Sequence, residues 1–217
     1  ASMLFGAIAA IGQTNLKRLV AYSSIGHVGY ALAGVATGTN EGMQSSVIYI
    51  IIYILMNLGL FSCLLMMKRE NQYYEKIEDL SGLSKNHPML ALSLMIILFS
   101  LAGIPPLAGF FAKFYVFKSV IEQSMYFLAI VGLLSTVVAA FYYLRLIKIM
   151  YFDKEKEKYD TDHGLWLKFS LTFSTLLILV YFIFPSQLIE VVSRINIIWW
   201  SLKFSDIKKL RVQTIQQ

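Results

Sequence analysis

The sequence predicts an all-α protein that crosses a membrane several times, and three observations support this fold class. Hydrophobic residues make up 57% of the chain and charged residues only 15%, and the mean hydropathy is +0.63. Apolar residues form runs of the length, about 20 residues, that a helix needs to cross the hydrocarbon core. Lys and Arg mostly flank these runs, as in membrane-protein loops. The formal charge of +6 therefore indicates loops at a membrane and no nucleic-acid partner.

The first apolar run is too short to span a bilayer, and five full-length candidates follow it. We interpret residues 1–11 as the end of a partial first helix, so an N-terminal half is expected to be either a separate chain or missing. The full candidates lie at about 17–37, 45–67, 89–121, 125–152 and 165–184. They divide the chain into a repeat at 1–152, a loop with a final transmembrane helix at 153–185, and a tail at 186–217.

The run at 89–121 predicts a broken helix. One straight helix over this range would be about 50 Å long, whereas the hydrocarbon core is about 30 Å thick. Pro105 and Pro106 do not fit a helix interior, and Gly103 and Gly109 loosen the backbone on either side. We expect two half-helices joined by an unwound stretch, which membranes tolerate only inside protein or beside water.

Loop charges predict the orientation. Lys and Arg gather near 17–18, 68–85 and 145–158, whereas the loops around 40–41 and 122–123 contain none. The basic face is expected on the cytoplasmic or matrix side of a bacterial cytoplasmic (inner) membrane or a mitochondrial inner membrane. The tail departs from this pattern, because it carries Arg194, Lys203, Lys208, Lys209 and Arg211. Its residues 197–200 indicate a segment that lies in the membrane interface.

Lys113 is the first candidate functional residue. It is the only charged residue between 89 and 117, and a lone ammonium in lipid costs about 3 kcal/mol on insertion scales. Beside a broken helix, such a residue is typical of an ion path, in which the amine gains and loses a proton. The alternative is a lysine that snorkels to the surface from a helix end, as Lys118 would one turn on.

His27 is the second candidate. It lies about 15 Å deep if its helix begins near Lys17, on a helical face that it shares with Ser23 and Tyr30. Histidine titrates near neutral pH and can relay protons. The alternative is a neutral histidine that forms hydrogen bonds between helices.

The next helix carries a polar stripe at i, i+4 and i+8, formed by Tyr49, Tyr53 and Asn57. This stripe could order water for proton transfer, or it could simply pack against neighbouring helices. No phosphate-binding loop, zinc spacing, nucleophile motif or cofactor signature is present. We therefore expect no redox chemistry and no cofactor in this chain itself.

Other polar residues are predicted to have structural roles. Tyr142, Tyr143 and Arg145 lie near the basic face and are interpreted as interface anchors. Glu41 and Glu122 lie at loop edges and are expected to be solvated.

Two segments carry a family resemblance: NLKRLVAYSSIGHVGY at 15–30 and SLAGIPPLAGFFAKFY at 100–115. They resemble the antiporter-like membrane subunits of respiratory complex I, and EDLSGL at 78–83 and AFYYLR at 140–145 fit as well. The resemblance covers roughly residues 1–190. It implies a fold of two inverted five-helix repeats, of which this chain would be the second repeat plus the last helix.

The resemblance also implies a function. Such a subunit helps to couple NADH:quinone electron transfer to proton translocation, with the output-side lysine at the position of Lys113 and a central polar residue at that of His27. NADH, FMN, iron–sulfur clusters and quinone would be bound by other subunits of the enzyme complex. The partners would be other membrane-arm subunits and membrane lipid.

Three alternatives stay open. The chain could belong to a cation/proton antiporter or a membrane hydrogenase of the same superfamily. It could be a structural membrane scaffold that does not pump, in which case Lys113→Met would have no functional effect. It could also be a truncated product of a broken gene.

Overall fold

The computed structural model describes residues 1–70, 72–156, 159–160, 164–183 and 187–194. Most of this part of the chain is helical. The helices are α1 (Ser2–Ile11), α2 (Leu16–Ala36), α3 (Asn40–Met66), the 3-10 helix η1 (Ile77–Leu80), α4 (Leu83–Asn86), α5 (Pro88–Ala102), α6 (Ala108–Glu122), α7 (Tyr126–Phe152) and α8 (Leu165–Val180). Residues 187–194 are helical as well. The strands β1 (Lys68–Arg69) and β2 (Gln72–Tyr73) form an antiparallel hairpin in which Lys68 pairs with Tyr73.

The long helices confirm the predicted all-α membrane fold. Among the described residues, α2, α3 and α7 are long and apolar enough to cross a membrane. Side-chain caps set the starts of two of them. Asn15 accepts a hydrogen bond from the Arg18 amide at 3.0 Å, and Thr39 accepts one from the Gly42 amide at 3.1 Å. The Thr39 cap explains why α3 begins five residues before the expected position 45.

The broken helix is present as predicted. Helix α5 ends at Ala102 and α6 begins at Ala108. Gly103 has a φ of 88°, a left-handed conformation that glycine adopts without strain and that ends α5. At Gly109, a Cβ atom would overlap the Ser100 carbonyl oxygen. Glycine there allows the start of α6 to pack directly against the end of α5.

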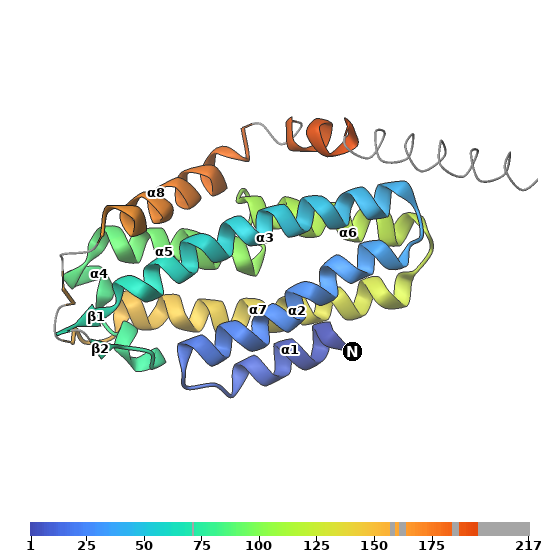
Figure 1. Cartoon of the computed structure of the whole chain (residues 1–217). Helices are drawn as coiled ribbons and strands as arrows, with labels where there is room; N and C mark the ends of the chain where they lie inside the picture. The colour runs from blue at the N-terminus through green and yellow to red at the C-terminus, as the bar shows by residue number, and fades with distance from the viewer. Residues whose placement is uncertain (71, 157–158, 161–163, 184–186, 195–217) are drawn as a thin grey trace, which may run out of the picture.

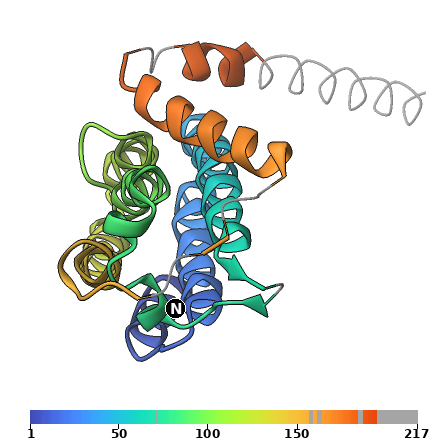
Figure 2. The same ribbon diagram turned by 90° about the vertical axis from the view of Figure 1, so that its left-hand side faces the viewer.

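The helices form an elongated bundle with two different ends (Figure 1, Figure 2). The described parts of three connections, 12–15, 67–70 with 72–87, and 153–156 with 159–160, lie at one end, called the basic end because most loop lysines and arginines of the described residues lie there. The connections at 37–39 and 123–125 lie at the other, called the outer end. Helix α3 packs against α2, α5, α6 and α8, and α7 packs against α1 and α5. Side chains of α2, α3, α6 and α7 therefore meet in the middle of the bundle.

The C-terminal part differs from the expected spans. Helix α8 has 16 residues, or about 24 Å at the α-helical rise, which is shorter than the expected run to residue 184. The helix at 187–194 lies beside α3 in Figure 1, and the Gln44 side-chain amide donates to the Ile189 carbonyl at 3.1 Å. The interfacial segment expected at 197–200, and the basic residues Lys203, Lys208, Lys209 and Arg211, lie outside the described residues. The division at 152 and 185 stays a prediction.

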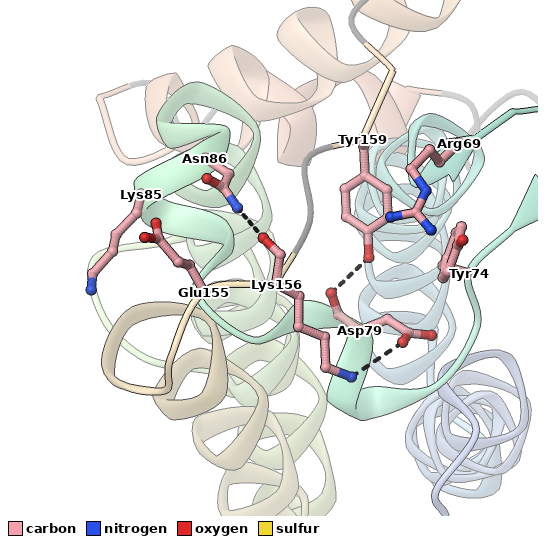
Figure 3. Close-up of a pocket in the computed structure, with 8 residues that line it drawn as sticks. All are labelled: Arg69, Tyr74, Asp79, Lys85, Asn86, Glu155, Lys156 and Tyr159. Atoms are coloured by element: carbon pink, nitrogen blue, oxygen red, sulfur yellow. Dashed lines mark hydrogen bonds and ion pairs between the residues drawn. The ribbon is translucent and has the colours of Figure 1, made fainter.

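A clamp of loop residues closes the basic end around a cavity of about 830 Å³ (Figure 3). The Tyr159 hydroxyl donates to the Asp79 carbonyl at 2.6 Å, and Lys156 lies 3.6 Å from the Asp79 carboxylate. The Asn86 amide donates to the Lys156 carbonyl at 2.6 Å. Burial, and the nearby carboxylate of Asp79, raise the pKa of Tyr159 above its usual range. These contacts tie the loop after α7 to η1 and α4, so we interpret the cavity as part of a structural clamp.

Candidate functional site

Lys113 lies inside the bundle at the break between α5 and α6. Its side chain is buried, and its amine donates to the carbonyl oxygens of Leu101 and Ala102 at 3.0 and 3.1 Å. These carbonyls belong to the last turn of α5, where backbone acceptors have no helical partner and where the helix carries partial negative charge. The broken helix therefore supplies the acceptors that a buried amine needs.

The alternative of a snorkelling Lys113 is wrong. Lys113 turns into the protein, whereas Lys118 is exposed and lies 3.8 Å from the Glu122 carboxylate. Glu41 and Glu122 are exposed, as predicted. Among the described residues, no carboxylate forms an ion pair with Lys113. A neutral amine has two N–H groups, one for each carbonyl, so both protonation states can keep these contacts, and the ammonium makes them more strongly.

Tyr30 covers the Lys113 amine from the side of α2. The amine lies 5.1 Å from the centre of the Tyr30 ring, within the range of a cation–π interaction. The Tyr30 hydroxyl lies 2.8 Å from the Ser135 hydroxyl and accepts from Thr136 at 3.0 Å. Two residues of α7 thus fix the ring that faces Lys113.

His27 joins three helices. It is 3% exposed, its Nδ1 lies 2.7 Å from the Tyr49 hydroxyl on α3, and its Nε2 lies 3.2 Å from the Tyr143 hydroxyl on α7. The Tyr143 hydroxyl also forms a hydrogen bond with Ser23, one turn before His27 on α2. The imidazole stacks on the Tyr53 ring, with 4.6 Å between ring centres.

These contacts form a hydrogen-bonded chain, Ser23–Tyr143–His27–Tyr49, whose direction can reverse. A neutral imidazole has one donor and one acceptor nitrogen. If Tyr49 donates to Nδ1, then Nε2 donates to Tyr143 and Tyr143 donates to Ser23. In the other tautomer, every bond in the chain runs the opposite way. Such a chain can accept a proton at one end and release one at the other.

The Tyr30 ring lies between His27 and Lys113. Its centre is 6.0 Å from the His27 ring and 5.1 Å from the Lys113 amine. No hydrogen bond in the described part of the chain joins Lys113 to His27. The two titratable groups therefore lie on either side of one aromatic ring.

The structure brings most of the predicted polar residues together, with two differences. Tyr53 stacks on His27 but donates its own hydroxyl to Ser24 at 2.8 Å. Asn57 donates to the Tyr53 carbonyl on its own helix at 3.0 Å. It therefore lies on the predicted stripe without extending the hydrogen-bonded chain.

Tyr143 is the residue that sequence reasoning missed. The prediction that Tyr142 and Tyr143 are interface anchors is wrong, because each is only 2% exposed and Tyr143 bonds His27. Arg145 is exposed, near the Ile11 carbonyl. The signal was the spacing: Tyr143 follows Ser135 by eight residues, which places both on one face of α7.

Comparisons with known proteins place this geometry in a family. A family model described as "NADH:quinone oxidoreductase/Mrp antiporter, TM" matches residues 1–139. The chain is 79% identical to NADH-quinone oxidoreductase subunit N of Pelagibacter ubique, over 91% of this chain and 42% of that protein. It is 51% identical to subunit N of Rhodospirillum rubrum, over 87% of this chain and 39% of that protein. The chain therefore spans about two fifths of the length of these curated relatives.

Solved structures give the same fold. Respiratory complex I from Thermus thermophilus contains a chain with a TM-score of 0.76 and 28% identity, over 87% of this chain and 43% of that one. An archaeal membrane-bound sulfane sulfur reductase matches with a TM-score of 0.79 and 27% identity, over 90% of this chain and 39% of that one. The Mrp complex from Dietzia matches with a TM-score of 0.77 at 21% identity, over 88% of this chain and 44% of that one, which shows the fold alone.

Proposed function

The chain belongs to the family of membrane subunits shared by NADH:quinone oxidoreductases and Mrp antiporters, and from this membership we propose that it is a proton-translocating part of subunit N of NADH-quinone oxidoreductase. In this role it couples electron transfer between NADH and quinone to proton movement. NADH, FMN, iron–sulfur clusters and quinone are bound by other subunits. The partners are other membrane-arm subunits, an N-terminal half and lipid, in a bacterial inner membrane.

The observation that carries this proposal is the placement of Lys113. A buried amine on the free carbonyls of a broken helix lies beside a hydrogen-bonded chain that can reverse its direction. Intramembrane ionisable residues at helix breaks mark ion paths. Lys113 takes up a proton inside the bundle and releases it toward the outer end, and His27 with its tyrosine partners moves protons within the bundle.

Two other functions are alternatives to this proposal: a cation/proton antiporter subunit, and a structural scaffold that does not pump. A cation/proton antiporter subunit would share the same fold, as the Mrp likeness shows. The relatives that are 79% and 51% identical are both subunit N, which favours the respiratory enzyme. Co-purification with a quinone-reducing arm distinguishes the two, because an antiporter would lack it.

The test is Lys113→Ala in the intact complex. We expect proton pumping by inverted membrane vesicles to fall while the complex still assembles, because alanine can neither hold nor release a proton. Lys168→Ala is the matched control: Lys168 also lies on an apolar helix but is exposed, so pumping should not change. Normal pumping by Lys113→Ala or Lys113→Met complexes would instead support a structural scaffold.

A further inference from the structure

A small cavity opens at the outer end between α3 and α6. Its volume is about 210 Å³, enough for several water molecules. Glu41, Lys118 and Glu122 line it and are exposed, while Ser45 and Ser119 line it and are only 4% exposed. The helix at 187–194 contributes Ile189 to the wall. The cavity thus runs from a charged rim to two buried hydroxyls.

The two serines face each other across the contact between α3 and α6. Their hydroxyl oxygens are 3.2 Å apart. Each also donates to its own helix, Ser45 to the Gly42 carbonyl at 2.8 Å and Ser119 to the Val116 carbonyl at 2.9 Å. A hydroxyl has one proton to donate, so two protons serve three hydrogen bonds. At any moment one bond is unmade, and the pair can switch between arrangements.

The serine pair lies between the cavity and the buried chain. Ser45 precedes Tyr49 by one turn of α3, on the same helical face, and the Tyr49 hydroxyl contacts His27. Ser119 lies six residues beyond Lys113 on α6, about 9 Å closer to the outer end. Ser45 therefore lies nearer the outer end than Tyr49, and Ser119 lies nearer the outer end than Lys113.

The path inward from the serine pair is closed in this structure. Val116 is fully buried on α6 between Lys113 and Ser119. The Tyr49 hydroxyl points to His27 rather than to Ser45. A proton can pass only when water or a side-chain movement bridges this gap, which is about 9 Å along α6 between Ser119 and Lys113. The serine pair therefore lies where a gate would be needed.

The rim suits the release of protons. It carries two carboxylates, those of Glu41 and Glu122, against one amine, that of Lys118, which is paired with Glu122. Clustered carboxylates make the local potential negative and attract protons and cations. Glu41 and Glu122 line this cavity, and the connections beside them, at 37–39 and 123–125, lie at the end of the bundle opposite the basic loops (Figure 1).

We propose that this cavity is a water-filled vestibule through which protons from Lys113 leave the bundle, and that Ser45 and Ser119 are positioning residues that gate it. This inference rests on the proposed function. A proton released by the Lys113 amine passes to bridging water, the serine hydroxyls accept on one side and donate on the other, and a vestibule water receives it. The bland alternative is that two small serines merely let α3 and α6 pack closely.

Thiol labelling tests the vestibule without measuring pumping. Ser119→Cys and Ser45→Cys are introduced singly into the full complex, where the only other cysteine of this chain, Cys63, is fully buried. A membrane-impermeant, charged thiol reagent is added from either side of oriented vesicles, and modification of this chain is read by mass spectrometry. We expect labelling of Ser119→Cys from the outer side alone, and faster labelling during NADH oxidation.

Glu122→Cys at the rim shows that the reagent reaches the outer end, and the unsubstituted chain reports on Cys63. If Glu122→Cys is labelled and neither serine position is, the vestibule is sealed packing and the proposal fails. Labelling of Ser119→Cys from the basic side would also overturn it.

A second measurement uses the double variant Ser45→Ala/Ser119→Ala, for which we expect fewer protons moved per NADH with normal assembly.

The outcomes separate this proposal from the function on which it rests. If Lys113→Ala stops pumping but the double serine variant pumps normally and its cysteine counterparts stay unlabelled, the vestibule is wrong and the proposed function stands. If Lys113→Ala pumps normally while Ser119→Cys is labelled from the outer side, the proton role of Lys113 fails and the water-filled vestibule stands.

Discussion

Lys113 and His27 could be found from the sequence because each is a titratable residue inside an apolar run, where its presence needs a reason. The side chains that contact them could not be found in this way. The bonds from His27 to Tyr49 and Tyr143 join three helices, and which side chains meet depends on how far each helix is rotated about its axis. Spacing within one helix fixes a face, but it does not say which face of a neighbour lies opposite.

Tyr143→Phe tests the hydrogen-bonded chain Ser23–Tyr143–His27–Tyr49 by removing a single oxygen atom. It removes the hydroxyl that joins Ser23 to His27 and leaves two buried polar groups without that partner, at a cost of about 1–3 kcal/mol. We expect fewer protons moved per NADH and a lower thermal stability of the complex. Tyr126→Phe is the control, because Tyr126 is exposed at the outer end of the same helix. Equal pumping by the two variants would remove Tyr143 from the proton path.

At the scale of elements, the broken helix was the most predictable feature. The excess length of the run at 89–121 and the pair Pro105–Pro106 both required an interruption, and it lies at 103–107. The sequence did not show that the break provides hydrogen-bond acceptors for the Lys113 amine. The α5 carbonyls that receive Lys113 are free because α5 ends at Ala102, and Gly109 lets α6 begin against that end.

Gly109→Ala tests this close approach. A methyl group would overlap the Ser100 carbonyl, and overpacking of this kind typically costs about 1–3 kcal/mol. We expect less assembled complex on native gels and a lower melting temperature, because α6 must move away from α5. Gly12→Ala should be tolerated, since Gly12 has a φ of −77° and open space around its Cβ position. Equal stability of the two variants would show that the contact between half-helices is not tight.

At the scale of the whole molecule, the two ends of the bundle differ in kind. The basic end is held by loop contacts between distant parts of the chain, such as the amide of Asp160 with the carbonyl of Lys68 at 2.9 Å. At the outer end, α3 contacts the helix at 187–194 through Gln44 and contacts α6 through the pair of Ser45 and Ser119. Hydropathy and loop charge predicted that the basic loops gather at one end, and the side of the membrane on which that end lies stays a prediction. They could not predict these long-range contacts, because backbone groups of irregular segments leave no pattern in the sequence.

The clamp at the basic end predicts an alkaline limit to stability. The pKa of Tyr159 is raised by burial and by Asp79, so the folded protein favours the neutral phenol. Below the ordinary tyrosine pKa of about 10 this contribution is fully present. As pH rises through that value, the unfolded chain ionises first and the contribution is progressively lost.

Tyr159→Phe should therefore lower the melting temperature at pH 8, because it removes the hydrogen bond to the Asp79 carbonyl, worth about 1 kcal/mol. The difference from the unsubstituted protein should shrink above about pH 10, where tyrosine begins to ionise in the unfolded chain. Thermal unfolding of the detergent-solubilised protein, followed by circular dichroism at several pH values, measures this difference. Tyr73→Phe is the control, since Tyr73 on β2 is 53% exposed. A difference for Tyr159→Phe that stays constant across this pH range would mean that the phenol is not held neutral by the fold.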